Sequence, residues 1–183
     1  DDLVSVEASD TDERQVSLRV EFEPEQAHRF RVRTTWRDRE YDDGAGPLGG
    51  PSTGDGLRVD AEYRHRLGRY HFLNFDLRAE SNDSANPERR YSRESASVSY
   101  TRPLTPDLRL RPAVELRQTR FDGRLTPSLA AREDRQLVPE VELLWWPGQW
   151  RIEGEAKYVF GDSNDPLRDR LVPLNRKYPL REL

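Results

Sequence analysis

Apolar and polar residues alternate with a period of two along most of this chain. In residues 16–23, every even-numbered residue from Val16 to Phe22 is apolar and every odd-numbered one from Ser17 to Glu23 is polar. A strand sends successive side chains to opposite faces, whereas a helix would scatter the apolar residues around its axis. The pattern therefore predicts strands with one apolar and one polar face. It occurs in residues 16–23, 30–37, 57–64, 73–80, 95–101, 108–117, 137–145 and 150–160.

The predicted connections alternate between short and long. Short turns are expected at residues 24–27, 68–69, 103–107 and 147–149, and long polar loops at 42–56, 81–94, 124–135 and from 162 onward. This asymmetry between the two rims is typical of transmembrane barrels. Pro112 and Pro139 fall inside predicted strands, so each predicts an edge strand, a bulge or a strand end.

The number of strands decides where the ends of the sheet lie. With about eight strands both ends would lie on the long-loop rim, whereas outer-membrane barrels return both ends to the short-turn rim. One further strand at each end, near residues 3–8 and 171–183, would give about ten. We therefore predict an all-β fold: an antiparallel up-and-down (meander) transmembrane β-barrel of about 8–10 strands. It forms one domain over residues 1–183, or a segment of a larger barrel.

Composition narrows the class of protein. Charged residues make up 35% of the chain and hydrophobic ones 34%, against about 25% and 45–50% in an average soluble domain. The strict alternation argues against the disorder that such a composition otherwise indicates. The 30 basic and 34 acidic residues nearly balance, which argues against a nucleic-acid partner. No stretch approaches the roughly 18 continuous apolar residues of a transmembrane helix, so crossing a membrane would require a closed barrel.

Two residue types are absent from the chain. Without cysteine, disulfides, thiolate catalysis and Cys-based metal sites are excluded. Without methionine, we expect a processed or excerpted chain, and removal of a signal peptide before Asp1 is one explanation.

The alternation allows the apolar face to point either toward lipid or into the core of a soluble barrel. In the first case the charged face lines a lumen, where arginine pairs with carboxylates through two hydrogen bonds. In the second case it is a solvated face of weak ion pairs. The residues predicted to line the lumen are Arg31, Arg33, Arg58, Glu62, Arg64, Asp76, Arg78, Arg109, Arg111, Glu115, Arg117, Glu140, Glu142, Arg151, Glu153 and Glu155.

Aromatic residues gather near the predicted strand ends. Amphipathic rings suit the headgroup layer of a bilayer, although rings would also plug the ends of a soluble barrel. Small residues on the apolar face, such as Ala61 and Ala96, are tolerated by lipid but would leave a soluble core underpacked. We predict the following membrane-interface aromatics: Trp36, Tyr70, Tyr100, Trp145, Trp146, Trp150, Tyr158 and Phe160.

The loops carry a family likeness. Residues 80–83 (Glu-Ser-Asn-Asp) leave one predicted strand, and residues 90–93 (Arg-Tyr-Ser-Arg) enter the next. Residues 161–166 leave the last predicted strand in the same way. The arrangement resembles proteobacterial outer-membrane barrels, including those of exopolysaccharide-export porins. The chain departs from them at residues 179–183, which lack the terminal aromatic that the insertion machinery reads, and this leaves completeness of the barrel open.

The resemblance implies a location in the outer membrane of a Gram-negative bacterium. The expected partners are the lipid bilayer and, beyond it, other envelope proteins or a polysaccharide. The expected function is that of a pore, an export channel or a structural component of an envelope complex. The alternatives are a soluble β-barrel that binds an apolar ligand and, less favoured, an outer-membrane barrel enzyme.

The sequence offers little catalytic chemistry. His28, His65 and His71 lack metal-ligand spacing, and no nucleophile elbow or triad order is found. Carboxylates spaced by two, such as Glu153 and Glu155, fit a polar lumen as well as a glycosidase. We therefore predict no catalytic residue, no cofactor and no metal site. A calcium ion held by loop residues is left open, on Asp162, Asn164 and Asp165.

Overall fold

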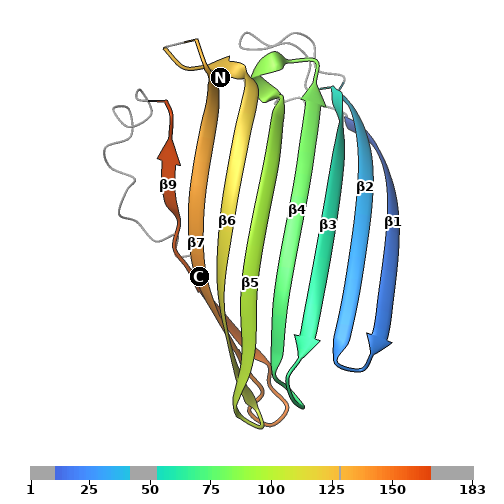
Figure 1. The fold of residues 1–183 in the computed structure, drawn as a ribbon, viewed down its shortest axis with the longest axis vertical. Coiled ribbons are helices and arrows are strands. Elements are labelled where there is room, and N and C mark those ends of the chain that lie inside the picture. The colour runs from blue at the N-terminus through green and yellow to red at the C-terminus, as the bar shows by residue number, and fades with distance from the viewer. Residues whose placement is uncertain (1–10, 42–52, 128, 166–183) are drawn as a thin grey trace, which may run out of the picture.

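The computed structural model describes residues 11–41, 53–127 and 129–165 as one antiparallel sheet (Figure 1). Each alternating segment of the sequence coincides with a strand, except that the last, residues 150–160, starts before its strand and is divided between two strands. The strands are β1 (Thr11–Glu25), β2 (His28–Tyr41), β3 (Gly54–Arg66), β4 (Phe72–Ser84), β5 (Tyr91–Thr105), β6 (Leu108–Leu125), β7 (Ala131–Trp145), β8 (Ile152–Lys157) and β9 (Phe160–Ser163). One 3₁₀ helix, η1 (Pro87–Arg89), lies between β4 and β5.

The strand order is β1 to β8 without crossovers, and β9 extends the edge by pairing with β7. The meander predicted from the sequence is therefore confirmed. The predicted closure is not: among the described residues β1 does not pair with β8 or β9, and the sheet stays open. Because β1 does not pair with the last strand, the sheet has two free edges, one at β1 and one at β8 and β9. The further strands predicted near residues 3–8 and 171–183 lie outside the described residues.

Pro139 explains why the last strand is divided. Glu140 pairs with Lys157 and Leu137 with Phe160 in one continuous register, so β8 and β9 are two parts of one strand. The break lies opposite Pro139, which has no N–H to donate to the ladder. The Pro139 carbonyl still accepts a hydrogen bond from Tyr158 N at 3.0 Å.

Pro112 interrupts the ladder between β5 and β6 in the same way. The register is the same on both sides of it, at Ser99–Ala113 and at Arg102–Leu110. The edge, bulge or strand end predicted for Pro112 and Pro139 is therefore wrong. Each lies inside a strand that has a neighbour on both sides, and the cost is one missing donor rather than a shift in register.

Replacing Pro139 by valine should join β8 and β9 into one strand. The new N–H would lie opposite Tyr158 O, and one added ladder hydrogen bond contributes about 1 kcal/mol. Amide hydrogen exchange should slow at residues 158–161. Pro112→Val is the positional control, because it should slow exchange in β5 and β6 only. Unchanged exchange at residues 158–161 in Pro139→Val would show that the proline does not cause the break.

The loops at one end are shorter than the sequence predicts. β4 continues to Ser84 and β5 begins at Tyr91, so the loop predicted over 81–94 shrinks to residues 85–90. Here both faces of the strands are polar, so no alternation marks the strand, yet the ladder continues with Asn82 opposite Tyr91. At η1, a Cβ on Gly123 would lie 1.9 Å from the Pro87 carbonyl oxygen. Glycine is therefore needed for η1 to approach β6.

The sheet is a single layer, and no apolar core forms between layers. The only buried hydrophobic side chain in the described residues is Val138, 3% exposed. The described polar residues that are buried lie on strands β4, β6 and β7 or in the loops between strands: Asn74, Ser84, Asn86, Thr119, Thr126 and Asp134. No helix in the described ranges is long and apolar enough to cross a membrane.

Candidate functional site

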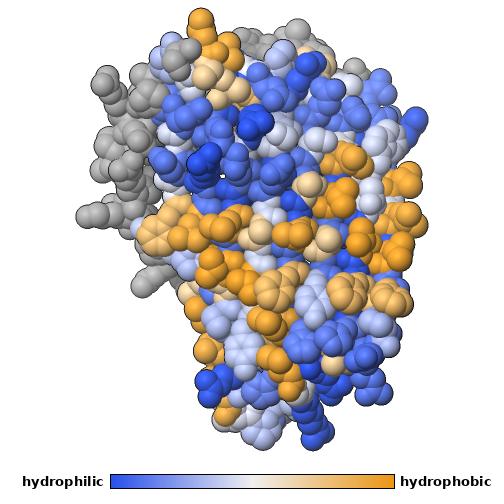
Figure 2. All heavy atoms as spheres, in the orientation of Figure 1, coloured by the Kyte–Doolittle hydropathy of each residue, from blue (hydrophilic) through white to orange (hydrophobic). Residues whose placement is uncertain are grey.

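An apolar belt crosses one face of the sheet. Residues directly opposite one another on paired strands share a face, so the register defines rows across the sheet. Figure 2 shows the apolar residues gathered across the middle of this face, with polar residues toward the long-loop end. One row is apolar on every strand: Val20, Val32, Ala61, Leu77, Ala96, Leu116, Leu137 and Phe160. The next row toward the short turns is Phe22, Phe30, Tyr63, Phe75, Val98, Val114 and Pro139.

The belt crosses the strands obliquely. On β1 it runs from Val16 to Phe22 and is centred at residue 19, and on β7 it runs from Leu137 to Trp145, centred at Val141. The row through residue 19 reaches β7 at Gln136, five residues from Val141. With about 3.3 Å per residue and about 4.8 Å between strands, the belt is inclined by about 30° from the perpendicular to the strands. In a barrel the strands are tilted relative to the barrel axis. An apolar belt perpendicular to that axis therefore crosses the strands at such an inclination.

The exposure of the two faces is the reverse of that in a soluble sheet. On β6, Val114 and Leu116 are exposed, while their polar neighbours Glu115 and Arg117 are half-buried. On β5, Val98 is exposed and Ser97 is half-buried. Soluble proteins place apolar side chains inside and charges outside. A continuous exposed apolar surface marks a site of contact with protein or membrane.

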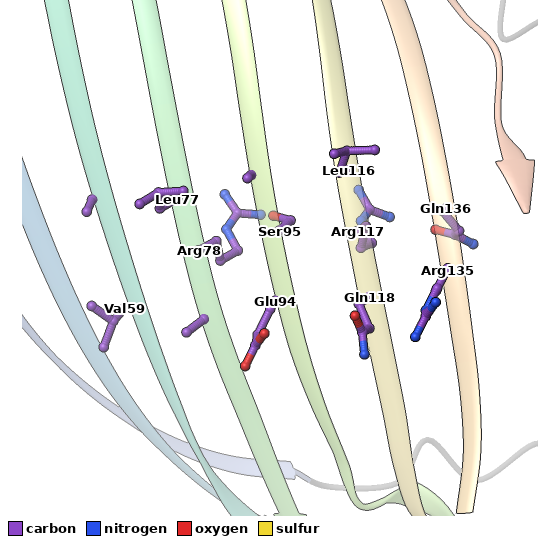
Figure 3. A pocket seen from close by; sticks show the side chains of 13 residues that line it. Val59, Leu77, Arg78, Glu94, Ser95, Leu116, Arg117, Gln118, Arg135 and Gln136 are labelled. Atoms are coloured by element: carbon purple, nitrogen blue, oxygen red, sulfur yellow. The ribbon is translucent and has the colours of Figure 1, made fainter.

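A shallow hollow of about 810 Å³ lies where the belt ends on β3 to β7 (Figure 3). Its apolar part includes Leu77 and Leu116, and Glu94, Gln118 and Arg135 lie along the side toward the long loops. The floor contains small residues, among them Ala61, Ala79 and Ala96. The sequence placed these small residues on the apolar face, and the register confirms that face for them.

The opposite face, called here the charged face, carries the residues predicted to line a lumen. Those that lie in strands share this face in the register, as in the row that joins Arg31, Glu62 and Asp76. Arg151 alone of the set precedes its strand, β8, and pairs with Glu153. The register therefore places the residues of this set that lie in strands on one common face of the sheet.

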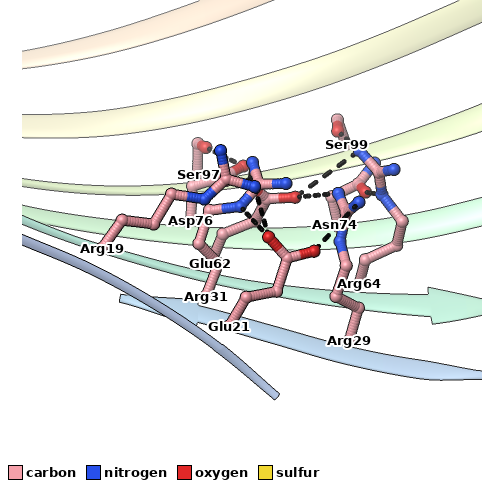
Figure 4. A network of polar contacts seen from close by, with 10 residues as sticks. All are labelled: Arg19, Glu21, Arg29, Arg31, Glu62, Arg64, Asn74, Asp76, Ser97 and Ser99. Carbon is pink, nitrogen blue, oxygen red and sulfur yellow. Dashed lines mark hydrogen bonds and ion pairs between the residues drawn. The ribbon is translucent and has the colours of Figure 1, made fainter. Parts of the chain in front are cut away.

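Glu62 lies at the centre of an ion-pair network on the charged face (Figure 4). Its carboxylate accepts hydrogen bonds from Arg29 at 3.0 Å and Arg31 at 2.9 Å. A nitrogen of Arg64 lies 3.5 Å from the same carboxylate. The Glu62 side chain is 20% exposed. One carboxylate is thus shared by three guanidinium groups from two strands.

The network extends to β1 and β5. Glu21 pairs with Arg19 and accepts a hydrogen bond from Arg31 at 3.3 Å. On the other side, Arg64 Nε donates to Asn74 Oδ1 at 2.8 Å, and Asn74 Nδ2 donates to Ser99 Oγ at 3.1 Å. Side chains of five neighbouring strands, β1 to β5, are therefore connected.

Cations and carboxylates are not matched evenly along the charged face. Asp60 accepts hydrogen bonds from Arg58 at 2.8 Å and Arg78 at 2.7 Å. Arg33 lines a cavity of about 380 Å³ with the Asp60 cluster and has no ion-pair partner among the described residues. At the other edge, Glu142 lies directly opposite Glu155. The carboxylates near β8 have cationic partners, since Glu142 pairs with Arg111 and Glu155 with Lys157, so the unmatched charge described here is that of Arg33.

Beyond the belt, at the long-loop end, two groups have shifted pKa values. Burial raises the pKa of the Tyr91 phenol, and its hydrogen bond to Glu80 at 2.6 Å raises it further. The hydrogen bond to Asp134 raises the pKa of the Arg132 guanidinium. Both groups thus keep their protonated form, so the pairs that join β4 to β5 and lie along β7 persist over the physiological pH range.

The predicted interface aromatics occupy several different positions. Tyr100 lies at the short-turn side of the belt, where its hydroxyl is 3.0 Å from His71 Nδ1. Tyr70 and Trp146 enclose the Arg109 guanidinium on the charged face, each ring centroid 4.6 Å from it. The rest lie on the apolar face or at the β7–β8 turn: Trp36, beside Leu57 and Val16; Trp145 and Trp150, near the turn; and Tyr158 and Phe160, at the height of the two central rows.

Sequence reasoning missed a row of stacked rings on the apolar face. Phe30 and Tyr63 stack at 4.7 Å between centroids, and Tyr63 and Phe75 at 6.1 Å. His28 and His65 lie in the next row toward the short turns. The sequence pattern shows that these residues share a face, but only the register shows that they are neighbours.

No protein-family model matches this chain, and no solved structure matches it.

Of the loop residues considered for calcium, Asn164 ties the end of the last strand to β7. Asn164 Oδ1 accepts a hydrogen bond from Glu133 N at 2.8 Å, and Asn164 Nδ2 donates to Ala131 O at 2.9 Å. Ser163 Oγ donates to Asp134 at 2.6 Å. Within the described ranges, no group of three or more His, Asp or Glu side chains is arranged to hold a metal ion. The spaced carboxylates Glu140, Glu142, Glu153 and Glu155 lie on the charged face.

Proposed function

We propose that this sheet is part of the wall of a β-barrel in the bacterial outer membrane, with the belt toward lipid and the charged face toward a polar interior. One observation carries the proposal: the belt is apolar on each strand, and on β5, β6 and β7 most of its residues are exposed while most of their neighbours on the other face are partly buried. In a transmembrane barrel the apolar residues point outward and the polar residues inward.

The height of the belt supports this orientation. It covers seven residues on β1, Val16 to Phe22, and nine on β7, Leu137 to Trp145. At about 3.3 Å per residue and an inclination of about 30°, this corresponds to about 20–26 Å along the membrane normal. The apolar band of outer-membrane barrels is about 25 Å tall. Toward the long loops, β1 and β4 continue beyond the belt with polar residues on both faces, as expected outside the bilayer.

The described strands do not close into a barrel by themselves. The free backbone groups of β1 and β8 would be costly in lipid, so further strands from the protein or from another subunit must close the wall. A barrel of about eight strands is filled by its own side chains, and a conducting pore needs more. The function is thus that of a pore, an export channel or a structural component, with the bilayer and other envelope proteins or a polysaccharide as partners.

The first test is extraction. The chain is expressed with a cleavable signal peptide in a Gram-negative host, and the membranes are washed with salt, urea and then detergent. We expect it to stay with the outer membrane until detergent is added and to migrate differently on a gel before and after boiling. A monodisperse protein that is soluble without detergent would contradict the proposal and favour a soluble barrel. That alternative requires the apolar face to be the enclosed one, which the exposure pattern opposes.

A further inference from the structure

Two histidines face each other across β2 and β3. His28 and His65 are direct partners in the register. Their ring centroids are 4.7 Å apart, with 29° between the ring planes. They lie on the apolar face at its short-turn end, one row beyond Phe30 and Tyr63. The two imidazole rings are therefore direct neighbours on one face of the sheet.

The surroundings of the pair also suit a metal ion. The Tyr63 hydroxyl is 2.8 Å from His28 Nδ1 and holds that ring in place, which leaves His28 Nε2 for another partner. Histidines that bind metals use one ring nitrogen while a hydrogen bond to the other fixes the ring. His65 Nδ1 is buried and has no hydrogen-bond partner. Buried polar atoms without partners are uncommon and call for an explanation such as an absent ion.

We propose that His28 and His65 form a binding site for a divalent transition-metal ion. Imidazole nitrogen suits Zn²⁺, Ni²⁺ and Cu²⁺ but not Ca²⁺ or Mg²⁺, which prefer oxygen ligands. The two imidazoles are the protein ligands, because among the described residues no third His, Asp or Glu side chain is arranged with them to hold a metal ion. Water completes the coordination. With fewer protein ligands than the four of a structural zinc site, the ion exchanges with solvent.

The site does not depend on the proposed membrane function. The pair lies in the row next to the two-residue turn between β1 and β2, so it is reached from water at the short-turn end whether the belt faces lipid or another protein. The third histidine provides a natural control. His71 pairs with Tyr100 rather than with another histidine, so it lacks a second imidazole.

Copper titration of the purified full chain tests the proposal. We expect one Cu²⁺ per chain, with an electron paramagnetic resonance spectrum showing two coordinated nitrogens. His28→Gln and His65→Gln should each weaken binding roughly 100-fold, because the second imidazole no longer acts at high effective concentration. Tyr63→Phe should weaken it less, since only the ring support is lost.

His71→Gln is the matched control and should leave the affinity unchanged. Circular dichroism should show the same strand content in every variant, so that a loss of binding is not a loss of fold. Binding that falls equally in all three histidine variants, or a spectrum with a single coordinated nitrogen, would overturn the proposal.

Discussion

Leu77→Arg should destabilise the protein in a bilayer by about 2–4 kcal/mol, the cost of arginine near the midplane on the lipid face of a barrel. Leu77 lies in the central row of the belt and is 59% exposed in the sheet. If the belt faced water, a charge at such an exposed position would change the stability by only about 0.5 kcal/mol. The same substitution therefore has different effects in the two environments.

Ser81→Arg provides the matched control. Ser81 lies on the same strand and face as Leu77 but beyond the belt, in the row of Ser92. Near the interface the cost of arginine falls to about 0–1 kcal/mol. Unfolding by guanidinium in phospholipid vesicles gives both values. Equal costs for the two variants would show that the belt does not face the hydrocarbon layer.

The alternation predicted the sheet because each strand has two different faces over its central part. Val16 to Phe22 is a clear example, and every such segment but the last lies in a strand. The prediction failed where that difference ends. Ser81 and Asn82 point to opposite faces but are both polar, so the pattern predicts a loop there. The backbone ladder needs no apolar face, and it continues to Ser84.

The charged face could be predicted as a set but not as a network. The alternation of odd- and even-numbered residues places Arg31 and Glu62 on the polar faces of their strands, and the structure confirms that they share one face. That Arg31, Arg29 and Arg64 converge on Glu62 depends on the register, which the two-residue turn at 26–27 begins to set. The predicted closure had no such basis, because no residue in the alternating pattern specifies what pairs with the outer edge of β1 or β8.

Glu62→Gln should destabilise the protein by about 2–4 kcal/mol. The change keeps the shape of the side chain but leaves Arg29, Arg31 and Arg64 without their shared carboxylate. Removing one partner of a buried ion pair costs about 3–5 kcal/mol. The 20% exposure of Glu62 reduces that estimate. Unfolding of the full chain, in detergent or vesicles, gives the value.

Glu153→Gln is the control for this prediction. Glu153 also lies on the charged face, but it is 51% exposed and pairs only with Arg151, so its loss should cost no more than about 1 kcal/mol. Adding Arg31→Gln to Glu62→Gln removes one of the three cations that shared Glu62 and should restore part of the stability. If Glu62→Gln and Glu153→Gln cost the same free energy of unfolding, the charged face is solvated around Glu62 as it is around Glu153. A large difference is expected when side chains crowd into an enclosed polar interior, where each charge depends on its neighbours rather than on solvent.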